Sequence, residues 1–270
     1  MARDGTDIGE WLLVFRKAGY DSRRASGMNA ESFSAIEKKY VEADLEFLES
    51  MQVRIVCEGD DAYPRQFESY LHDRCPRVLF CLGDTTLLQR SCVFICGARN
   101  ASKKGQEIAY KCARLAADAG FVVISGYARG IDLAAHMGTL EAGGSSVAIL
   151  PYGLSRFSIR RALAGIFDPE NFLAVSEMPP TSGFMVKGAL RRNVLLVALA
   201  DAVIVVEPGE SGGTWYSAEK ASALEKPLFY HEGHRPEIKP RMEMLGGEHI
   251  PVKRGVPSLD AVFEKLGDPQ

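Results

Sequence analysis

Four short loops combine glycine with cationic or hydroxyl side chains, which are residue types that bind phosphate. Glycine lets a ligand approach backbone N–H groups, and a guanidinium offers phosphate oxygens a planar pair of donors. The first loop, 97–105, reads GARNASKKG, and the second, 125–132, reads SGYARGID. The third, 183–193, reads GFMVKGALRRN, and the fourth, 207–214, reads EPGESGGT. Together the four loops predict a site for a phosphate-bearing ligand.

The candidate binding residues in these loops are glycines, hydroxyl residues, five cations and one amide. They are Gly97, Arg99, Ser102, Ser125, Gly126, Arg129, Gly130, Lys187, Arg191, Arg192, Asn193, Ser211, Gly212, Gly213 and Thr214. Ser102 is also placed to cap the helix that follows it. For the first loop the alternative is a tight turn whose basic side chains are solvated. For Asp132 in the second loop, a structural bond to backbone amides is the favoured interpretation.

The sequence predicts no catalytic residue, no metal site and no cofactor. It lacks the GxGxxG and GxxxxGK[ST] patterns of dinucleotide and triphosphate sites. His136 lies in an apolar helical stretch and is interpreted as a core residue. His231 and His234 form an HxxH pair, but no further ligands follow at metal-binding spacing. A nucleophile elbow and a pair of catalytic carboxylates are also missing from the sequence.

The loops follow short apolar runs that are typical of strands buried on both faces. These runs are 92–96, 121–124, 146–150, 172–175, 202–206 and 227–230, with 78–82 predicted as an edge strand. Amphipathic stretches at 105–119, 131–142, 187–200 and 215–224 alternate with them. This alternation predicts an α/β fold with a doubly wound, mostly parallel sheet. Ligands of such sheets bind outside the carboxyl ends of the strands, where the loops lie.

The first fifty or so residues differ in sequence pattern from the rest. Charged residues are frequent there, and apolar residues recur at helical spacing: Trp11, Leu12 and Phe15, then Leu45, Phe47, Leu48 and Met51. Tyr20–Met28 is polar and predicts a turn between helices. We therefore expect a small helical appendage over 1–60 and the main domain over 61–270. The polar, irregular tail after Tyr230 ends in an apolar-patterned segment, 259–266.

Composition indicates an ordinary folded protein. Of 270 residues, 46% are hydrophobic and 25% charged, which excludes a disordered chain. The 32 Lys and Arg are outnumbered by 35 Asp and Glu, so a nucleic-acid site must be local. The six cysteines lie mostly in apolar runs, as buried thiols in a reducing compartment do. With no basic, apolar leader at the start and no long apolar span, we expect a cytoplasmic protein away from membranes.

Longer stretches of the sequence resemble a known protein family. GARNASKKG, SGYARGIDLAAHMGTLEAGGSSVAILPYGL, RRN and VIVVEPGESGGTWYSAEKA resemble the DNA-processing protein A family (DprA/Smf). The similarity runs from about Leu45 to Tyr230, and 125–144 is its most specific part. The resemblance implies an extended Rossmann-like domain whose pocket binds single-stranded DNA in recombination and transformation. It also implies loading of the recombinase RecA and assembly of a homodimer.

Matched motifs carry six residues over from the family. Arg99 corresponds to the arginine of its G-S-R turn. Gly126, Arg129 and Gly130 correspond to its S-G-x-A-x-G-I-D loop, and 192–193 to its R-N pair. The resemblance therefore implies that these residues bind DNA.

The sequence departs from the family pattern in several places. Ala98 replaces the usual serine, 189–190 replace Phe-Pro, and Val194 replaces an arginine. Base stacking on an aromatic contributes about 1–3 kcal/mol, so Tyr127, Phe184 or Trp215 would have to replace the missing ring. The winged helix that many members carry at the C-terminus is not recognisable.

Three functions remain open at this point. The first is non-enzymatic binding of single-stranded DNA, with the five cations on phosphates. The second is a nucleotide sensor or a phosphoribohydrolase-like enzyme of the lonely-guy type, suggested by 212–219. In that enzyme Glu219 or Glu207 would stabilise positive charge on the ribose. The third is a scaffold that binds only phosphate or a protein partner.

Overall fold

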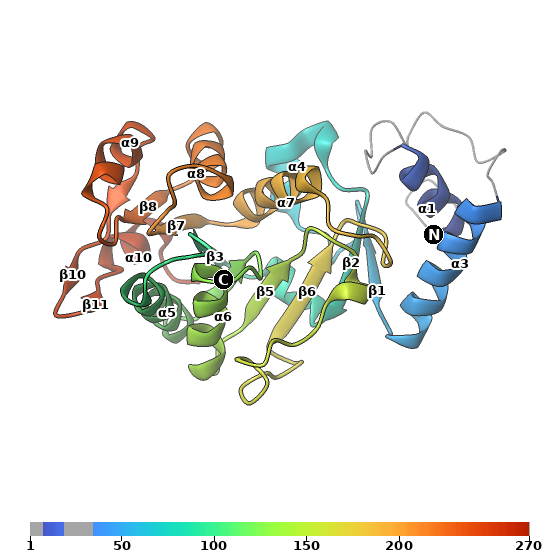
Figure 1. The fold of residues 1–270 in the computed structure, drawn as a ribbon, viewed down its shortest axis with the longest axis horizontal. Helices are drawn as coiled ribbons and strands as arrows, with labels where there is room; N and C mark the ends of the chain where they lie inside the picture. Colours follow the sequence, from blue (N-terminus) through green and yellow to red (C-terminus); the bar gives the residue numbers. More distant parts are fainter. Residues whose placement is uncertain (1–7, 19–34, 270) are drawn as a thin grey trace.

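The computed structural model describes residues 8–18 and 35–269, and its centre is one large sheet (Figure 1). The nine strands lie in the order β1-β2-β6-β5-β4-β3-β7-β8-β9. Their bounds are β1 Arg54–Cys57, β2 Val78–Gly83, β3 Cys92–Gly97, β4 Val122–Ser125, β5 Ser146–Ile149, β6 Phe172–Ser176, β7 Ala202–Val206, β8 Leu228–His231 and β9 Glu248–His249. From β6 to β9 all neighbours are parallel, whereas β2 runs antiparallel to β6 and to β1.

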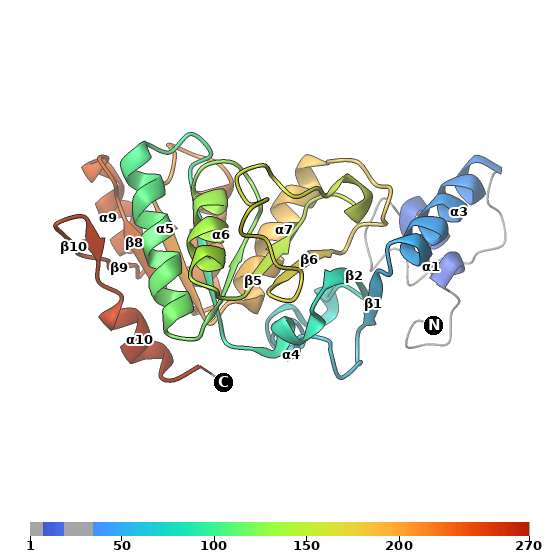
Figure 2. The same cartoon turned by 90° about the horizontal axis from the view of Figure 1, so that it is seen from below.

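Helices cover both faces of the sheet, as Figures 1 and 2 show. One face carries α4 (Arg65–Leu71), α7 (Val186–Leu199), α8 (Gly213–Ala223) and α9 (Lys239–Met244). The other carries α5 (Lys103–Asp118), α6 (Ile131–Glu141) and α10 (Asp260–Leu266). The described residues also form short elements: η1 His72–Arg74, η2 Thr85–Gln89, η3 Leu154–Arg156, η4 Pro236–Ile238, and the strand pair β10 Val252–Lys253 and β11 Val256–Pro257. The predicted doubly wound, mostly parallel, Rossmann-like α/β fold is confirmed.

The central strands form because their residues are apolar without interruption. Every residue of β4, β5 and β7 is buried, as expected for strands covered by helices on both faces. All six predicted central runs form strands, β3 to β8. The prediction for 78–82 is wrong in one respect. This run forms β2, but β2 is not an edge, because β1 pairs outside it.

Among the described residues, two helices precede the sheet: α1 (Ile8–Lys17) and α3 (Ala35–Ser50). In α1, Trp11 stacks on Phe15 with ring centroids 4.5 Å apart. The Arg16 guanidinium lies 2.6 Å from the carboxylate of Asp44 in α3. Asp44 is fully buried and also accepts a hydrogen bond from the backbone N–H of Thr181, 2.7 Å away. These contacts fasten both helices to the main body.

The segment 1–60 is therefore helical only in part, because 54–57 forms β1 of the main sheet. Leu48 is buried as its spacing predicts, whereas Leu45 and Met51 are exposed. The predicted turn at 20–28 lies outside the described residues. The division of the chain into two domains at residue 60 stays a prediction.

All six cysteines are buried thiols. Burial raises the pKa of Cys81 and of Cys112 to about 12. Thiols held neutral in this way are unreactive packing groups. Within 8–18 and 35–269, none of the helices has the length and apolar character needed to cross a membrane.

Candidate functional site

Two adjoining cavities open at the carboxyl ends of the central strands. The central cavity, of about 400 Å³, is lined by Phe94, Cys96, Gly97, Ala98, Arg99, Asn100, Ala128, Asp132, Arg192, Asn193, Gly209, Ser211, Gly212, Gly213, Thr214 and Ser217. The side cavity, of about 270 Å³, is lined by Arg99, Gly126, Tyr127, Ala128, Arg129, Pro151, Tyr152, Arg160, Phe184 and Arg192. Arg99, Ala128 and Arg192 line both cavities and form the wall between them.

Arg192 is the most unusual side chain of the wall. It comes from α7 and is buried, with only 7% of its surface exposed. Its Nη1 lies 3.9 Å from Asp132 Oδ2, and its Nε has no hydrogen-bond partner in the described part of the chain. Burial lowers the pKa of Arg192 and raises the pKa of Asp132. The guanidinium is thus only weakly neutralised, which favours binding of an anion.

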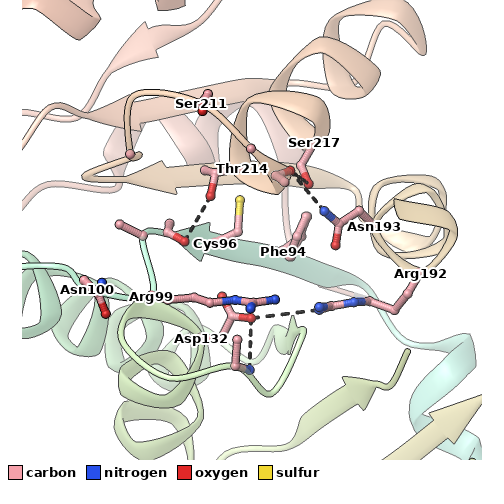
Figure 3. A pocket seen from close by; sticks show the side chains of 16 residues that line it. Phe94, Cys96, Arg99, Asn100, Asp132, Arg192, Asn193, Ser211, Thr214 and Ser217 are labelled. Carbon is pink, nitrogen blue, oxygen red and sulfur yellow. Dashed lines mark hydrogen bonds and ion pairs between the residues drawn. The ribbon is translucent and has the colours of Figure 1, made fainter. Parts of the chain in front are cut away.

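Arg99 faces Arg192 within this wall. Figure 3 shows the two guanidinium groups pointing toward each other, with Asp132 beside them. Arg99 is exposed, and no described residue forms an ion pair with it. Two like charges in one cavity repel each other, and a bound anion would relieve that repulsion.

Glycine is required at Gly126 and Gly130. A Cβ at Gly126 would lie 1.3 Å from Arg192 Nη1, so only glycine leaves room for the guanidinium. At Gly130 the backbone φ is 79°, and a Cβ would lie 2.4 Å from the carbonyl oxygen of Ala98. Gly130 therefore lets α6 begin directly against the first loop, but it does not line either cavity.

Polar side chains tie the loops of the central cavity together. Thr214 Oγ1 donates a hydrogen bond to the carbonyl oxygen of Gly97, 3.0 Å away. Asn193 Nδ2 donates to the carbonyl oxygen of Gly213 at the same distance. Asp132 Oδ2 accepts from the backbone N–H of Ala128, 3.2 Å away. Asp132 thus has the expected structural bond and also faces the cavity.

The structure brings ten of the fifteen candidate residues to the cavities. They are Gly97, Arg99, Gly126, Arg129, Arg192, Asn193, Ser211, Gly212, Gly213 and Thr214. The other five lie elsewhere. They are Ser102, Ser125, Gly130, Lys187 and Arg191.

Three of the five are engaged in the scaffold. Ser102 Oγ accepts from the backbone N–H of Gly105, which caps α5, and bonds the Glu207 carboxylate. The Ser125 hydroxyl is buried and donates to the carbonyl oxygen of Ile95. Arg191 Nε donates to Glu177 at 3.1 Å, away from Arg192, because adjacent helix residues point in different directions.

Arg160 also lines the side cavity, although it is not among the residues predicted from the sequence. Its Nη2 donates to the carbonyl oxygen of Tyr127 at 2.9 Å, and its guanidinium lies 5.1 Å from the centre of the Tyr127 ring. Tyr127 itself has a φ of 60°, which is unusual for a residue with a side chain. The basic run SRFSIRR at 155–161 was the available signal.

Aromatic rings are available in the side cavity. Phe184 lines the side cavity and is 54% exposed, and Tyr127 and Tyr152 also line this cavity. Trp215 does not line either cavity. Its Nε1 donates to the carbonyl oxygen of Gly209 and its ring contacts the Arg241 guanidinium. Phe184 is therefore the best placed replacement for the missing family aromatic.

The carboxylates suggested for phosphoribohydrolase chemistry lie outside the cavities. Glu219 is paired with Arg241 at 2.9 Å. Glu207 is buried and accepts from the backbone N–H and the hydroxyl of Ser102. Of the described residues that line the two cavities, Asp132 alone is acidic. The geometry thus gives no support to Glu219 or Glu207 as catalytic groups.

Comparison with known proteins identifies relatives. Protein Smf of Escherichia coli is 28% identical over 94% of this chain and 66% of its own length. DNA processing protein DprA of Streptococcus pneumoniae is 27% identical over 83% of this chain and 77% of its own. A putative DprA of Mycobacterium tuberculosis is 30% identical over 67% of this chain. The chain spans only 50% of that relative's length, and 52% of the DprA of Bacillus subtilis.

Solved structures share the fold. DprA from S. pneumoniae aligns with a TM-score of 0.66 and 23% identity over 94% of this chain and 93% of its own. DNA processing protein A from Helicobacter pylori, whose structure addresses its single-stranded DNA binding mode, aligns with a TM-score of 0.63 and 25% identity. That alignment covers 74% of this chain and 91% of the H. pylori chain.

A sequence model of the family described as DNA recombination-mediator protein A matches residues 54–247. Because this match covers most of the chain, the protein belongs to the DNA recombination-mediator protein A family, a family of DNA-processing proteins.

Proposed function

We propose that this protein binds single-stranded DNA in the central and side cavities, without catalysing a reaction on it. The observation that carries the proposal is the buried Arg192 guanidinium, weakly neutralised in the wall that the two cavities share. The H. pylori relative studied for single-stranded DNA binding supports the choice of ligand.

Phosphates would bind to the arginines. Arg99, Arg129, Arg160 and Arg192 line the cavities against one carboxylate, so the local charge is positive although the chain's net charge is −3. Each phosphate that an arginine neutralises releases condensed counterions. Binding should therefore weaken steeply as salt is added.

Bases would bind to the aromatic rings of the side cavity. Stacking needs a free base face, which a single strand offers and a duplex does not. Phe184 and Tyr152 lie beside Arg129 and Arg160 in this lining. The arrangement therefore favours single-stranded over duplex DNA.

Two finer functions rest on family membership. As a recombination mediator, the protein would pass its strand to a recombinase such as RecA and would act as a homodimer. Light scattering of the purified protein tests the dimer. RecA filament assembly on strands coated with the protein tests the transfer.

Fluorescence anisotropy with a labelled oligonucleotide tests DNA binding. We expect R99A to weaken binding at least about tenfold, because a hydrogen bond to a charged group contributes about 1.5–3 kcal/mol. The exposed Lys253 in β10 belongs to the separate β10–β11 strand pair and lines neither cavity. It provides a control, since K253A removes the same charge. Between about 50 and 200 mM salt, the logarithm of the affinity should fall by about 0.7 per phosphate bound for each unit of log salt. Salt-independent binding, or equal loss in R99A and K253A, contradicts the proposal.

A further inference from the structure

Two histidines and a glutamate gather at the carboxyl ends of β8 and β9, which lie side by side at one edge of the sheet (Figure 2). His231 ends β8, Glu232 follows it, and His249 belongs to β9. Glu232 Oε2 lies 2.7 Å from His249 Nε2 and 3.8 Å from His231 Nδ1. One ligand atom from each of the three residues lies within 4.8 Å of the others.

His231 is buried and makes no side-chain hydrogen bond to the described residues. It is only 7% exposed, and neither of its ring nitrogens forms a hydrogen bond with a described residue. A buried polar group left unpaired costs about 1–3 kcal/mol. Its Nδ1 nevertheless lies toward the Glu232 carboxylate, beyond hydrogen-bond distance. An unpaired imidazole beside a carboxylate and a second imidazole indicates that a ligand is missing between them.

We propose that His231, Glu232 and His249 bind a divalent transition metal ion, with Zn²⁺ as the best match. Imidazole nitrogen and carboxylate oxygen are Zn²⁺ ligands at about 2.0–2.2 Å, which places tetrahedral ligand atoms roughly 3.3 Å apart. The observed 2.7 and 3.8 Å separations lie on either side of that value, and all three ligand atoms lie within 4.8 Å of one another. Side-chain rotations that replace the Glu232–His249 hydrogen bond with metal ligation would bring the atoms into place. Ca²⁺ and Mg²⁺ prefer all-oxygen sites and do not suit two imidazoles.

The side chain of His249 is 36% exposed, so an ion can enter from solvent and a water can complete the coordination. The HxxH pair of the sequence is not the site. His234 is 67% exposed and its Nδ1 lies 3.6 Å from buried Glu207 instead. The ligands are therefore His231 and His249, which the pairing of β8 with β9 brings together.

The metal would also act on the wall of the central cavity. Just beyond Glu232, Arg235 Nη1 donates to the carbonyl oxygen of Pro208, 3.4 Å away. Pro208 belongs to the loop 207–214, which contributes Gly209 and 211–214 to the central cavity. An ion that joins β8 to β9 would therefore stiffen the segment on which this loop rests.

Titration of chelator-treated, full-length protein with Zn²⁺ tests the site, and it needs no DNA, so its outcome is independent of the proposed DNA binding. We expect one ion per chain by calorimetry and a rise in the thermal midpoint, because an ion that binds only the folded state stabilises it. In H249A and in E232Q, both partly exposed positions, affinity should fall at least tenfold. Co²⁺ should give the visible absorption of a tetrahedral ion in the native protein and not in H249A.

H234A and H72N are the controls, since both remove an exposed histidine. Each should retain the native stoichiometry and affinity. Absence of binding at equimolar Zn²⁺, native affinity in H249A, or a loss in H234A as large as that in H249A would each overturn the assignment.

Discussion

Replacement of Gly126 by alanine should remove the function of Arg192 without removing a charge. A Cβ at this position would lie 1.3 Å from Arg192 Nη1 and 2.7 Å from Asp132 Oδ2, so the guanidinium must leave its place. The displaced atom is the end of a flexible side chain, so the fold should survive. One charged hydrogen bond to phosphate is worth about 1.5–3 kcal/mol, which corresponds to a loss of roughly 10- to 150-fold in affinity.

Anisotropy with single-stranded DNA measures this loss, and G165A is the matched control, because a Cβ at Gly165 would meet no atom within 4 Å. In a double-mutant cycle, G126A should add little in an R192A background, since the interaction is already gone. The salt dependence should also decrease by about 0.7, the share of one phosphate contact. If G126A binds within twofold of the native protein, Arg192 does not hold the strand and the reasoning is refuted.

Three further substitutions distinguish residues that stabilise the fold from residues that bind DNA. S102A should cost about 0.5–2 kcal/mol of stability in urea denaturation, because it removes the cap of α5, and should leave DNA affinity unchanged. F184A should weaken DNA binding by about 1–3 kcal/mol per stacked base, measured by anisotropy, with no comparable effect of V186A at the neighbouring exposed position. Burial lowers the pKa of His136 from 6.5 to about 3, so below pH 6.5 the unfolded chain takes up a proton that the folded chain does not. Stability should fall with decreasing pH from 6.5 toward 3, by up to about 1.4 kcal/mol per pH unit, and denaturation of H136Q at pH 7 and 5 should show a smaller fall.

The sequence predicts the central strands well because burial on both faces demands uninterrupted apolar runs. The same rule misses β1, which has an exposed arginine at position 54, and β9, which consists of two polar residues. Without β9, no sequence argument can place His249 beside His231. Contacts that depend on a strand of two residues are visible only in three dimensions.

The candidate site was predictable in its loops but not in each side chain. Arg191 and Arg192 look equivalent in the sequence. The buried residues of α7 include Gly188, Arg192, Leu195 and Leu199, a helical spacing that places Arg192 on the inner face. This spacing of apolar residues is present in the sequence and could have distinguished the buried Arg192 from its neighbour Arg191. Arg160 could not be placed, because the irregular segment after β5 has no periodic pattern.

The charged partition between the two cavities has a consequence for valency. A mononucleotide bound in one cavity would have a single phosphate attachment, whereas a strand bound in both cavities would link its second attachment to the first. Such tethering raises the local concentration of the second phosphate and multiplies the overall avidity. A protein built on this partition would discriminate by ligand length, ignoring the mononucleotides that crowd a cell and retaining polymers.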